Sequence, residues 1–448
     1  MINYISILTY ILFIIAIHML SYPKIAYKGN FLAFYGMIII ITANLFTLPQ
    51  KYLLPSLLLI FIGALIGIVM AKKIKMQNLP QAIALLNGFG GISTALIGLT
   101  EIRSILPTTF LTLFIINIGF TTFSGSISSY LKLSSSKPTI NTKAIKLISF
   151  LLFITLFLSY FYPNKETSIY IYTISFLSLL FGFCFIYPIG GAGMPIIISI
   201  LNSFSGWSTV FVGFTINNSL LVITGSIIGA SGIILTYIMT KSMNRSFIKI
   251  FFSLHPLSKL STSPNNKHFN QGNAIDAAFF MENAKKIIIV PGYGMASSNA
   301  EHDLVTMAEI LKSKYHVDVK FAIHPVAGRM PGHMNVLLAE ANANPDDIFE
   351  LKDINQEFKT TDVVYIIGAN DITNPLSKTL KDSPIYQMPI LEVEQAKRIL
   401  FVKRSLSTGY ANIDNPLFYD DKTIMLLGDA KEITSQIITQ LEQNIPTS

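Results

Sequence analysis

The residue pattern with the clearest chemistry follows a short apolar run at residues 285–290. The run, Lys285-Lys-Ile-Ile-Ile-Val290, leads into Pro291-Gly-Tyr-Gly-Met-Ala-Ser297. Two glycines two residues apart let a backbone turn tightly and approach a pyrophosphate, which the start of a following helix can hold. The third position of this fingerprint is Ser297 instead of glycine or alanine. Taken alone, the pattern therefore also suits a plain strand-to-helix turn.

A cationic cluster, Lys403-Arg404-Ser405, follows another apolar run at 398–402. These side chains suit a phosphate, which arginine can bind through two parallel hydrogen bonds. An NAD site needs a carboxylate near the end of the second strand, for the ribose hydroxyls. The run that ends at Ala322-Ile-His-Pro325 carries none. Together these features favour NADP over NAD, although the basic pair alone also suits a solvated strand end.

Three further loops carry polar groups. The loop from His324 to His333 holds two histidines and one arginine, with no acidic or cysteine partner at the spacing of a metal site, so we expect no metal. Gly368-Ala-Asn-Asp371 ends another apolar run with an amide and a carboxylate, and Ser407-Thr-Gly-Tyr-Ala411 could close over a ligand. No general base stands beside a nucleophilic serine or cysteine. Hydride transfer needs none, because it requires two carbon centres held close together and dry.

Alternating strands and helices must position these loops. We expect strands at 285–290, 316–323, 348–351, 362–368, 398–402 and 423–427, with helices at 296–313, 335–341 and 430–442. This alternation predicts an α/β doubly wound, Rossmann-like parallel sheet at 284–448, with ligands at the carboxyl ends of its strands. A Ser/Pro/Asn-rich linker is predicted at 246–283.

The first half of the chain differs sharply in composition. Residues 1–245 hold 14 Lys and Arg and only two acids, Glu101 and Glu166, whereas residues 246–448 hold 19 basic and 23 acidic residues. The net charge of +8 therefore comes from the apolar half, which excludes a basic soluble nucleic-acid-binding protein. It also excludes a single soluble domain. The one cysteine, Cys184, lies in an apolar run and cannot form an internal disulfide or a Cys-based metal site.

Nine apolar stretches in the first half are long enough to span a bilayer. They lie at 3–20, 31–49, 52–71, 82–100, 106–126, 145–162, 168–187, 194–214 and 216–239. Alternate loops carry 12 lysines and arginines against three in the opposite loops. The positive-inside rule then places the amino terminus outside and everything after residue 245 in the cytoplasm.

Polar side chains also lie within or at the ends of these spans: Asn44, Asn87, Asn202, Asn217, Asn218 and Ser231. An amide in hydrocarbon usually faces the interior of the helix bundle or a water-filled path. For each of these residues, a hydrogen bond between helices is as good an interpretation as a role in transport. No Asp or Lys lies mid-span, and no arginines are regularly spaced, so a voltage sensor is not expected.

In this order, the motifs resemble the beta subunit of the proton-translocating NAD(P) transhydrogenases over the whole chain. The matching motifs are Val290–Ala296, His324–Asn335, Gly368–Asp371, Lys403–Ser405, Thr408–Ala411 and Gly428–Lys431. The resemblance implies NADP(H) on this chain, NAD(H) on a separate alpha subunit, and direct hydride transfer coupled to inward proton movement. It also implies a dimer of alpha–beta units in the bacterial inner membrane, with no nucleic acid as partner.

The resemblance also implies roles for individual residues. The pyrophosphate would contact Gly292, Tyr293, Gly294, Met295 and Ala296, and Val326, Ala327, Gly328, Arg329, Met330 and Pro331 would line the cofactor. Lys403, Arg404 and Ser405 would hold the 2′-phosphate, while Gly409, Tyr410 and Ala411 would form a lid. Gly368, Ala369, Asn370 and Asp371, with Gly428, Asp429, Ala430 and Lys431, would complete the site. His324 and Asp371 would couple protonation to binding at the nicotinamide end.

In the membrane, Asn202 and Ser231 match the family pattern, but three positions depart from it. Asn87 stands where the family has a histidine, Gln81 replaces a glutamate and Gly193 replaces an aspartate. Asn87, Asn202 and Ser231 are predicted to lie on the proton path, and we expect a membrane helix of the alpha subunit to supply the histidine. Two alternatives are a channel or transporter gated by a cytosolic NADP-binding domain, and a membrane dehydrogenase that passes electrons to quinone.

Overall fold

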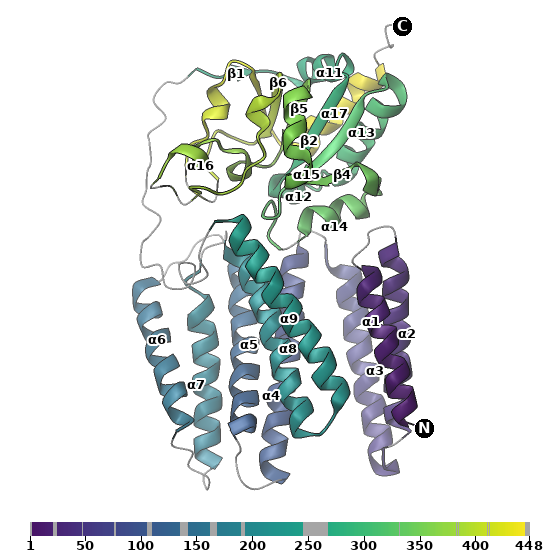
Figure 1. Cartoon of the computed structure of the whole chain (residues 1–448), viewed down its shortest axis with the longest axis vertical. Coiled ribbons are helices and arrows are strands. Elements are labelled where there is room, and N and C mark those ends of the chain that lie inside the picture. The colour runs from purple at the N-terminus through teal and green to yellow at the C-terminus, as the bar shows by residue number, and fades with distance from the viewer. Residues whose placement is uncertain are drawn as a thin grey trace. The chain divides into compact units, whose positions relative to one another are not determined.

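A computed structural model gives the fold of the chain (Figure 1). It describes residues 2–20, 25–46, 48–75, 78–104, 110–134, 142–161, 168–189, 193–244, 268–330, 332–381, 383, 385–409, 411 and 413–443. Contacts divide the chain into two compact units. The first consists of residues 1–79 with 218–220, and the second of residues 80–217 with 221–448.

Within the described part of residues 2–242, the apolar stretches form nine helices. These are α1 (Ile2–Leu20), α2 (Ala26–Leu45), α3 (Gln50–Lys73), α4 (Leu79–Ser104), α5 (Phe110–Ser134), α6 (Thr142–Ser159), α7 (Ser168–Ile186), α8 (Met194–Thr215) and α9 (Ser219–Ser242). Seven of them, all except α1 and α6, are long and apolar enough to cross a membrane. The described apolar parts of α1 and α6 are shorter, at Ile7–Leu20 and Ala144–Ser159. Nine spans therefore remain a prediction, whereas seven apolar helices are established.

The first unit contains α1, α2 and α3. Helices α1 and α2 pack closely, because a Cβ atom at Gly29 would lie 2.9 Å from the carbonyl oxygen of Ala16. Helix α3 has no buried residue in this chain, and side chains such as Leu58 and Phe61 are exposed. A helix that is apolar around its whole circumference is suited to lipid or to a neighbouring helix of another chain.

In the second unit, small residues bring the membrane helices together. A Cβ atom at Gly91 of α4 would lie 2.8 Å from the carbonyl oxygen of Gly119 of α5. A Cβ atom at Gly206 of α8 would lie 2.4 Å from the backbone nitrogen of Gly229 of α9. Helix association in lipid depends on such close backbone contact, since the helices gain no hydrophobic free energy from one another. The glycines therefore fix where α4 meets α5 and where α8 meets α9.

The second half of the chain forms a seven-stranded sheet in which every neighbouring pair is parallel. Its strands are β1 (Asn270–Gln271), β2 (Lys286–Pro291), β3 (Asp318–Ile323), β4 (Ile348–Glu350), β5 (Val363–Ile367), β6 (Arg398–Lys403) and β7 (Thr423–Leu427). The order is β1-β7-β6-β5-β2-β3-β4, so the direction of strand addition reverses between β2 and β5. The side chains of 287–290 in β2 have no exposed area, which explains their continuous apolar sequence. The predicted parallel α/β sheet is confirmed.

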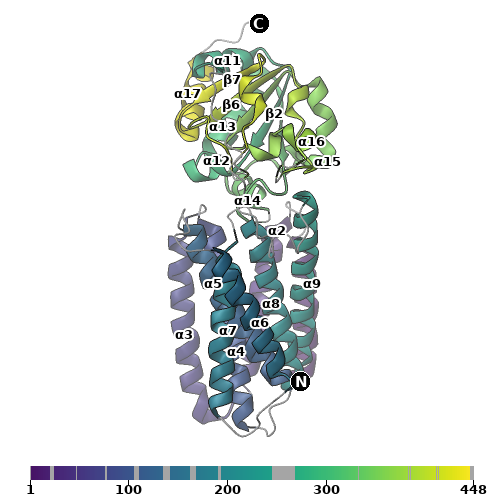
Figure 2. The same ribbon diagram turned by 90° about the vertical axis from the view of Figure 1, so that its left-hand side faces the viewer.

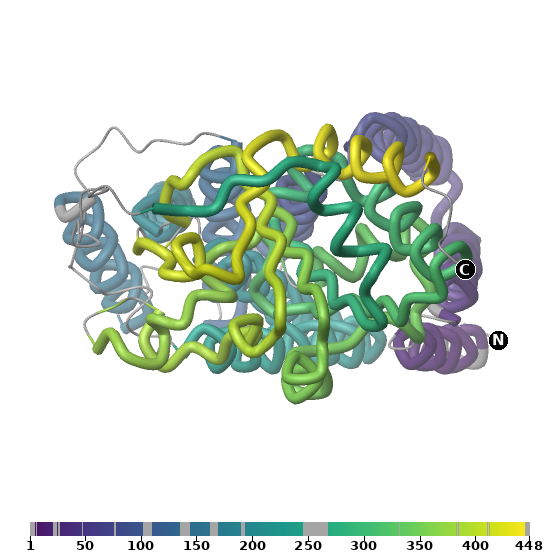
Figure 3. The backbone as a smooth tube through the Cα atoms, turned by 90° about the horizontal axis from the view of Figure 1, so that it is seen from above, coloured from purple at the N-terminus to yellow at the C-terminus, as the bar shows by residue number. Residues whose placement is uncertain are grey.

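Helices cover both sides of this sheet. On one side α11 (Ala274–Glu282), α13 (Glu301–Tyr315) and α17 (Ala430–Gln443) pack on one another, and Figure 2 shows α15 (Leu351–Ile354) and α16 (Leu376–Thr379) on the other. Figure 3 shows the yellow coil of α17 along one side of this domain. Helices α12 (Tyr293–Ser298) and α14 (His333–Glu340) follow β2 and the loop after β3. The short 3-10 helices are η4 (Pro345–Asp347), η5 (Asn355–Thr360), η6 (Asp371–Thr373), η7 (Val393–Gln395) and η8 (Pro416–Tyr419).

Strand β1 and helix α11 lie inside the region that the sequence analysis assigns to the linker. Strand β1 pairs with β7, and α11 buries Ala277, Ala278 and Met281 completely. Helix α11 begins with a capping box, in which Asn273 accepts from the N–H of Asp276 and the Asp276 carboxylate accepts from the N–H of Asn273. The folded sheet domain therefore includes residues before 284.

Candidate functional site

A cavity of about 460 Å³ opens at the carboxyl ends of β2, β5 and β6. It lies at the reversal of strand order, where loops from neighbouring strands diverge and leave room for a ligand. Most of the residues predicted from the sequence to bind a cofactor line it. These are Tyr293, Gly294, Val326, Ala327, Gly328, Arg329, Gly368, Ala369, Asn370, Asp371, Lys403, Arg404, Ser405, Gly409, Ala411, Gly428 and Ala430.

Three glycines join the ends of β2 and β5 backbone to backbone. A Cβ atom at Gly292 would lie 2.5 Å from the carbonyl oxygen of Gly368, and one at Gly294 would lie 2.4 Å from the Gly368 Cα. Gly368 also has a φ of +68°, which favours glycine. The N–H of Gly294 donates to the Gly368 carbonyl at 2.8 Å, and the N–H of Gly292 to that of Ile367 at 2.9 Å. The glycines thus allow the loops after β2 and β5 to pack backbone to backbone, in addition to allowing the close approach of a ligand.

Arg329 and Tyr293 form one wall of the cavity. The Arg329 guanidinium carbon lies 4.1 Å from the centre of the Tyr293 ring, a cation–π contact. The backbone N–H of Arg329 donates to Nδ1 of His333 at 3.2 Å. Burial, together with the nearby positive charge of Arg329, lowers the pKa of His333 to about 4. His333 is therefore neutral at ordinary pH and accepts a hydrogen bond that orients the loop.

His324 is placed behind the cavity and does not line it. It is 2% exposed, its Nδ1 accepts from the N–H of Val326 at 3.2 Å, and its Nε2 is 2.8 Å from the Pro389 carbonyl oxygen. Since Nδ1 accepts, the proton of the neutral ring must lie on Nε2 and be donated to Pro389. Burial lowers the pKa of His324 to about 4, against the opposing effect of that bond. In this conformation His324 positions the backbone of Val326 and is uncharged at ordinary pH.

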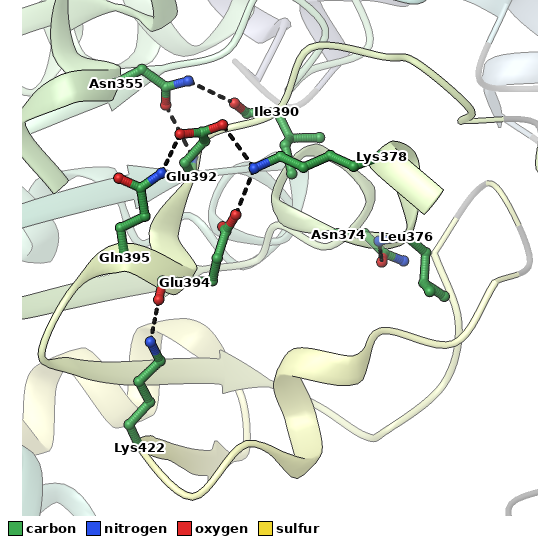
Figure 4. Close-up of polar contacts among 9 residues, drawn as sticks. All are labelled: Asn355, Asn374, Leu376, Lys378, Ile390, Glu392, Glu394, Gln395 and Lys422. Atoms are coloured by element: carbon green, nitrogen blue, oxygen red, sulfur yellow. Dashed lines mark hydrogen bonds and ion pairs between the residues drawn. The ribbon is translucent and has the colours of Figure 1, made fainter. Parts of the chain in front are cut away.

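A polar network, shown in Figure 4, holds the segment that carries Pro389. The Asn355 side chain donates to the Ile390 carbonyl at 3.1 Å and accepts from the N–H of Glu392 at 3.0 Å. Lys378 then bridges the carboxylates of Glu392 and Glu394 at 2.7 and 2.8 Å. These residues were not predicted from the sequence, because they match no motif. Asn355 begins η5, which precedes β5, and the others come from the long connection between β5 and β6.

Asp371 ties the glycine-containing segment 409–411 to the end of β5. The N–H of Ala411 donates to Oδ2 of Asp371 at 2.9 Å, and a Cβ atom at Gly409 would lie 2.4 Å from Oδ1. Beside it, Asn415 donates to Oδ1 of Asn370 at 3.0 Å. The segment predicted as a lid is thus anchored at the rim of the cavity.

The cationic cluster lies at the end of β6. Lys403 donates to the Ser407 carbonyl oxygen and lies 4.7 Å from the centre of the Phe418 ring. Burial lowers its pKa to about 8, although Asp371 and Asp414 act in the opposite direction. Arg404 is 2.8 Å from the carboxylate of Asp429 and donates to the Ser298 hydroxyl at 3.1 Å. Ser405 donates to the Ser407 hydroxyl at 2.9 Å. An ammonium, a guanidinium and hydroxyl groups therefore meet at one end of the cavity.

The remaining predicted cofactor residues divide into two groups. Gly292, Met295, Ala296, Met330, Asp429 and Lys431 support the cavity without lining it. Pro331 and Tyr410 lie outside the described residues. The cavity also gains residues that the analysis did not assign to it: Ser297, Ser298, Ile372, Ile385, Met388, Val402, Ser407 and Thr408. Ser298 could have been predicted, because it lies in the short helix that follows the glycine turn. Ile385 and Met388 could not, because they lie in a connection whose sequence has no periodicity.

The membrane residues predicted for a proton path differ in their burial and in their hydrogen-bond partners. Asn87 of α4 is buried, and its amide donates to the Ile198 carbonyl of α8 at 3.3 Å. Asn202 is half-buried on α8, and Ser231 is exposed on α9 with its hydroxyl bonded to Ile228 of the same helix at 2.9 Å. Of the two other departures from the family pattern, Gln81 is buried and Gly193 immediately precedes α8.

Comparison with known proteins identifies the family. A model of the NAD(P) transhydrogenase beta subunit matches residues 2–440. The chain belongs to the NAD(P) transhydrogenase beta subunit family. The NAD(P) transhydrogenase subunit beta of Rhodospirillum rubrum is 43% identical over 447 residues, which cover 96% of this chain and 96% of the relative. The protein of the same name from a designated strain of that organism gives the same values.

Membership of the NAD(P) transhydrogenase beta subunit family establishes several predictions. The chain is a subunit of an enzyme complex that acts on nicotinamide nucleotides, and the family's designation as the beta subunit implies an alpha subunit as partner. The seven apolar helices agree with a membrane protein.

Proposed function

We propose that this transhydrogenase beta subunit binds NADP(H) in the cavity at the ends of β2, β5 and β6. Lys403, Arg404 and Ser405 lie in the same cavity as the glycine turn, and this observation carries the proposal. A cation pair with hydroxyl groups matches a phosphate monoester, which NADP(H) has at the 2′ position and NAD(H) lacks. The cavity volume of about 460 Å³ falls within the range of ligand sites in proteins.

The glycine turn at Gly292–Ala296 would hold the pyrophosphate. Because Gly292 and Gly294 already donate their N–H groups to β5, other groups on the cavity wall must add to this contact. Arg329, stacked on Tyr293, is the nearest charged candidate. The nicotinamide would then lie toward Asp371, Val326 and the apolar side chains Ile385 and Met388, which exclude water from the reacting ring.

When bound, NADP(H) supplies or accepts the hydride, and the partner nucleotide, NAD(H), would be held by the alpha subunit. This chain's residues contribute orientation and a dry wall, which direct hydride transfer needs in place of an acid or base. Asp371 holds Ala411 of the lid, and through its charge it also acts on Lys403. Asp371 is therefore the residue we expect to link the lid to the phosphate end.

For the membrane half we propose nine spans, with the amino terminus outside, residues 1–245 as the proton-translocating domain and the sheet domain in the cytoplasm of a bacterium. The distribution of lysines and arginines supports this topology. We place the linker between α9 and β1, since β1 and α11 belong to the sheet domain. A dimer of alpha–beta units is the proposed assembly.

We further propose that Asn87 is part of the proton path together with Asn202 and Ser231. An amide does not titrate at ordinary pH, so Asn87 can orient water or a histidine but cannot carry the proton itself. Its hydrogen bond to the backbone of α8 supports a location inside the bundle. A histidine on a membrane helix of the alpha subunit would supply the titrating group.

The test uses the purified chain with and without its alpha subunit. We expect NADPH to reduce an NAD analogue only when both subunits are present, with proton movement into vesicles that contain the complex. Reduction by the beta chain alone would contradict the two-subunit mechanism. Failure of both preparations, with NADP bound no better than NAD, would reject the NADP site.

A further inference from the structure

Asp429 forms an ion pair with the guanidinium of Arg404 at one end of the cavity. Its Oδ2 lies 2.8 Å from Nη2 of Arg404 and accepts from the Ser298 hydroxyl at 3.0 Å. Nη2 of Arg404 also donates to the Ser298 hydroxyl at 3.1 Å. The three side chains therefore form a closed triangle at the phosphate end of the cavity.

The Asp429 carboxylate is ionised in this arrangement. Partial burial acts to raise its pKa, but hydrogen bonds from Arg404 and Ser298 outweigh this effect, and the pKa lies below its usual value. If a 2′-phosphate binds Arg404, its charge and that of Asp429 would face the same guanidinium. A phosphate that binds Arg404 through two N–H groups has to share the guanidinium with Asp429 or replace it.

The pair can be broken at small cost. The Arg404 side chain is 63% exposed and that of Asp429 is 30% exposed. Ion pairs that reach solvent contribute little to stability, so a dianionic phosphate can displace a single carboxylate. A nucleotide without the phosphate leaves the pair intact.

We propose that Asp429 is a built-in competitor of the 2′-phosphate for Arg404, and that it thereby lowers the affinity for NADP(H) and speeds its release. Asp429 is a specificity-determining residue in this role. The proposal rests on the proposed function, because it requires the 2′-phosphate to bind at Arg404. It adds a residue that works against binding to a site whose other polar groups favour it.

Asp429 also has a purely structural contact, which the test must preserve. Its Oδ1 accepts from the N–H of Lys431 at 3.0 Å, in the first turn of α17. Asparagine keeps this helix-capping contact and the side-chain volume, whereas alanine would lose both. Asp429→Asn is therefore the informative variant. Asp420→Asn is its matched control, since Asp420 makes the same type of contact with the N–H of Lys422 at 3.1 Å but precedes β7, whereas Asp429 follows that strand.

The experiment measures binding of NADP⁺ and NAD⁺ to the full-length chain in detergent by calorimetry. We expect Asp429→Asn to bind NADP⁺ about fivefold more tightly and to release it more slowly, with NAD⁺ unchanged. The gain should shrink as salt screens the charges, and it should vanish in an Arg404→Ala background. Asp420→Asn should match the unaltered protein.

The outcomes separate the two proposals. If the unaltered protein prefers NADP⁺ but Asp429→Asn gains no affinity for it, or gains equally for NAD⁺, the competitor role is wrong and the NADP site stands. If the unaltered protein binds NADP⁺ and NAD⁺ equally, the proposed function fails and the competitor role falls with it.

Discussion

Polar side chains are satisfied differently in the membrane helices and in the sheet domain. In the membrane helices most hydroxyls bond to their own helix, as Thr122 does to Ile118 and Ser178 to Ile174. In the sheet domain, polar side chains join distant loops, as Asp371 does with Ala411 and Arg404 with Asp429. A hydroxyl bonded to its own helix places no constraint on its neighbours. Polar residues therefore reveal contacts in the sheet domain far more directly than in the membrane.

Several contacts in the membrane helices depart from this rule, including that of the Ser199 hydroxyl of α8 with the Gly232 carbonyl of α9 at 2.9 Å. Asn87 of α4 donates to the backbone of α8, and Thr94 of α4 donates to the Ser208 hydroxyl of α8 at 3.1 Å. If the contrast between the regions is functional, substitutions at loop-joining positions should have large effects, and substitutions in the membrane should matter mainly at such cross-helix contacts.

The largest expected effect is at the cationic cluster. Lys403→Ala combined with Arg404→Ala should weaken NADP⁺ binding by about 100-fold or more, because each charge-assisted hydrogen bond contributes about 1.5–3 kcal/mol. NAD⁺ binding should change little. Calorimetry with both nucleotides measures the difference. Lys397→Ala, at the other end of the same strand and paired with Asp362, is the control; equal losses for both nucleotides would show that the cluster does not read the phosphate.

The next effect concerns the glycine contact between β2 and β5. In Gly368→Ala the new Cβ atom would lie 2.3 Å from the Gly294 Cα at a φ of +68°, so we expect a loss of about 2–4 kcal/mol in unfolding free energy. Gly332→Ala has the same φ, but among the described residues its Cβ would meet no atom within 4 Å, so it should lose only about 1 kcal/mol. Thermal unfolding of both variants separates the steric clash at Gly368 from the effect of the positive φ that both glycines share. Equal losses of unfolding free energy would show that the loops after β2 and β5 are not in tight contact.

A smaller effect should appear in the pH dependence. Lys403 has a pKa of about 8 and must be protonated to attract phosphate, so NADP⁺ affinity should fall as the pH rises above about 8. The fall is limited to about tenfold per pH unit, and NAD⁺ affinity should stay flat. Titrating affinity between pH 7 and 10 measures this. Lys403→Arg keeps its charge throughout and should flatten the curve; an unchanged curve would assign the titration to another group.

The smallest structural effect is expected at Asn87. Asn87→Leu removes an interhelical hydrogen bond, typically worth about 0.6 kcal/mol in a membrane, so the complex should still assemble. Proton-coupled transhydrogenation in vesicles should nevertheless be impaired, with NADP⁺ binding unchanged. Asn44→Leu is the control, because its amide bonds to Ile40 of its own helix. Pumping by Asn87→Leu at the rate of the unaltered complex would reduce Asn87 to a packing residue.

The sequence predicted the parallel sheet because its central strands are buried on both faces. Ile287–Val290 and Val363–Ile367 are continuously apolar for that reason. Strand β1, only Asn270 and Gln271, has no such signal and lies in a polar stretch that reads as linker. Its place in the sheet comes from pairing with β7, more than 150 residues later in the chain.

The same limit applies to the candidate site. Gly292, Gly368 and Lys403 were found because they follow apolar runs, and parallel strands bring their carboxyl ends to one edge. The neutral state of His324 could not be predicted, because it follows from burial in the folded chain. The position of its ring proton depends on the Pro389 carbonyl, 65 positions away. That carbonyl is in turn placed by Asn355, whose role no motif indicates.

The contact of Gly292 and Gly294 with Gly368 has a consequence for nucleotide exchange. Because these glycines meet backbone to backbone, no change of side-chain rotamer can widen the cavity on this side. Only a shift of the strands themselves would do so. Ala411, in the segment after β6, is held by a side chain instead, through the 2.9 Å hydrogen bond from its N–H to Asp371. If a nucleotide binds in this cavity, we therefore expect it to enter and leave past the segment after β6 and not past the glycine turn.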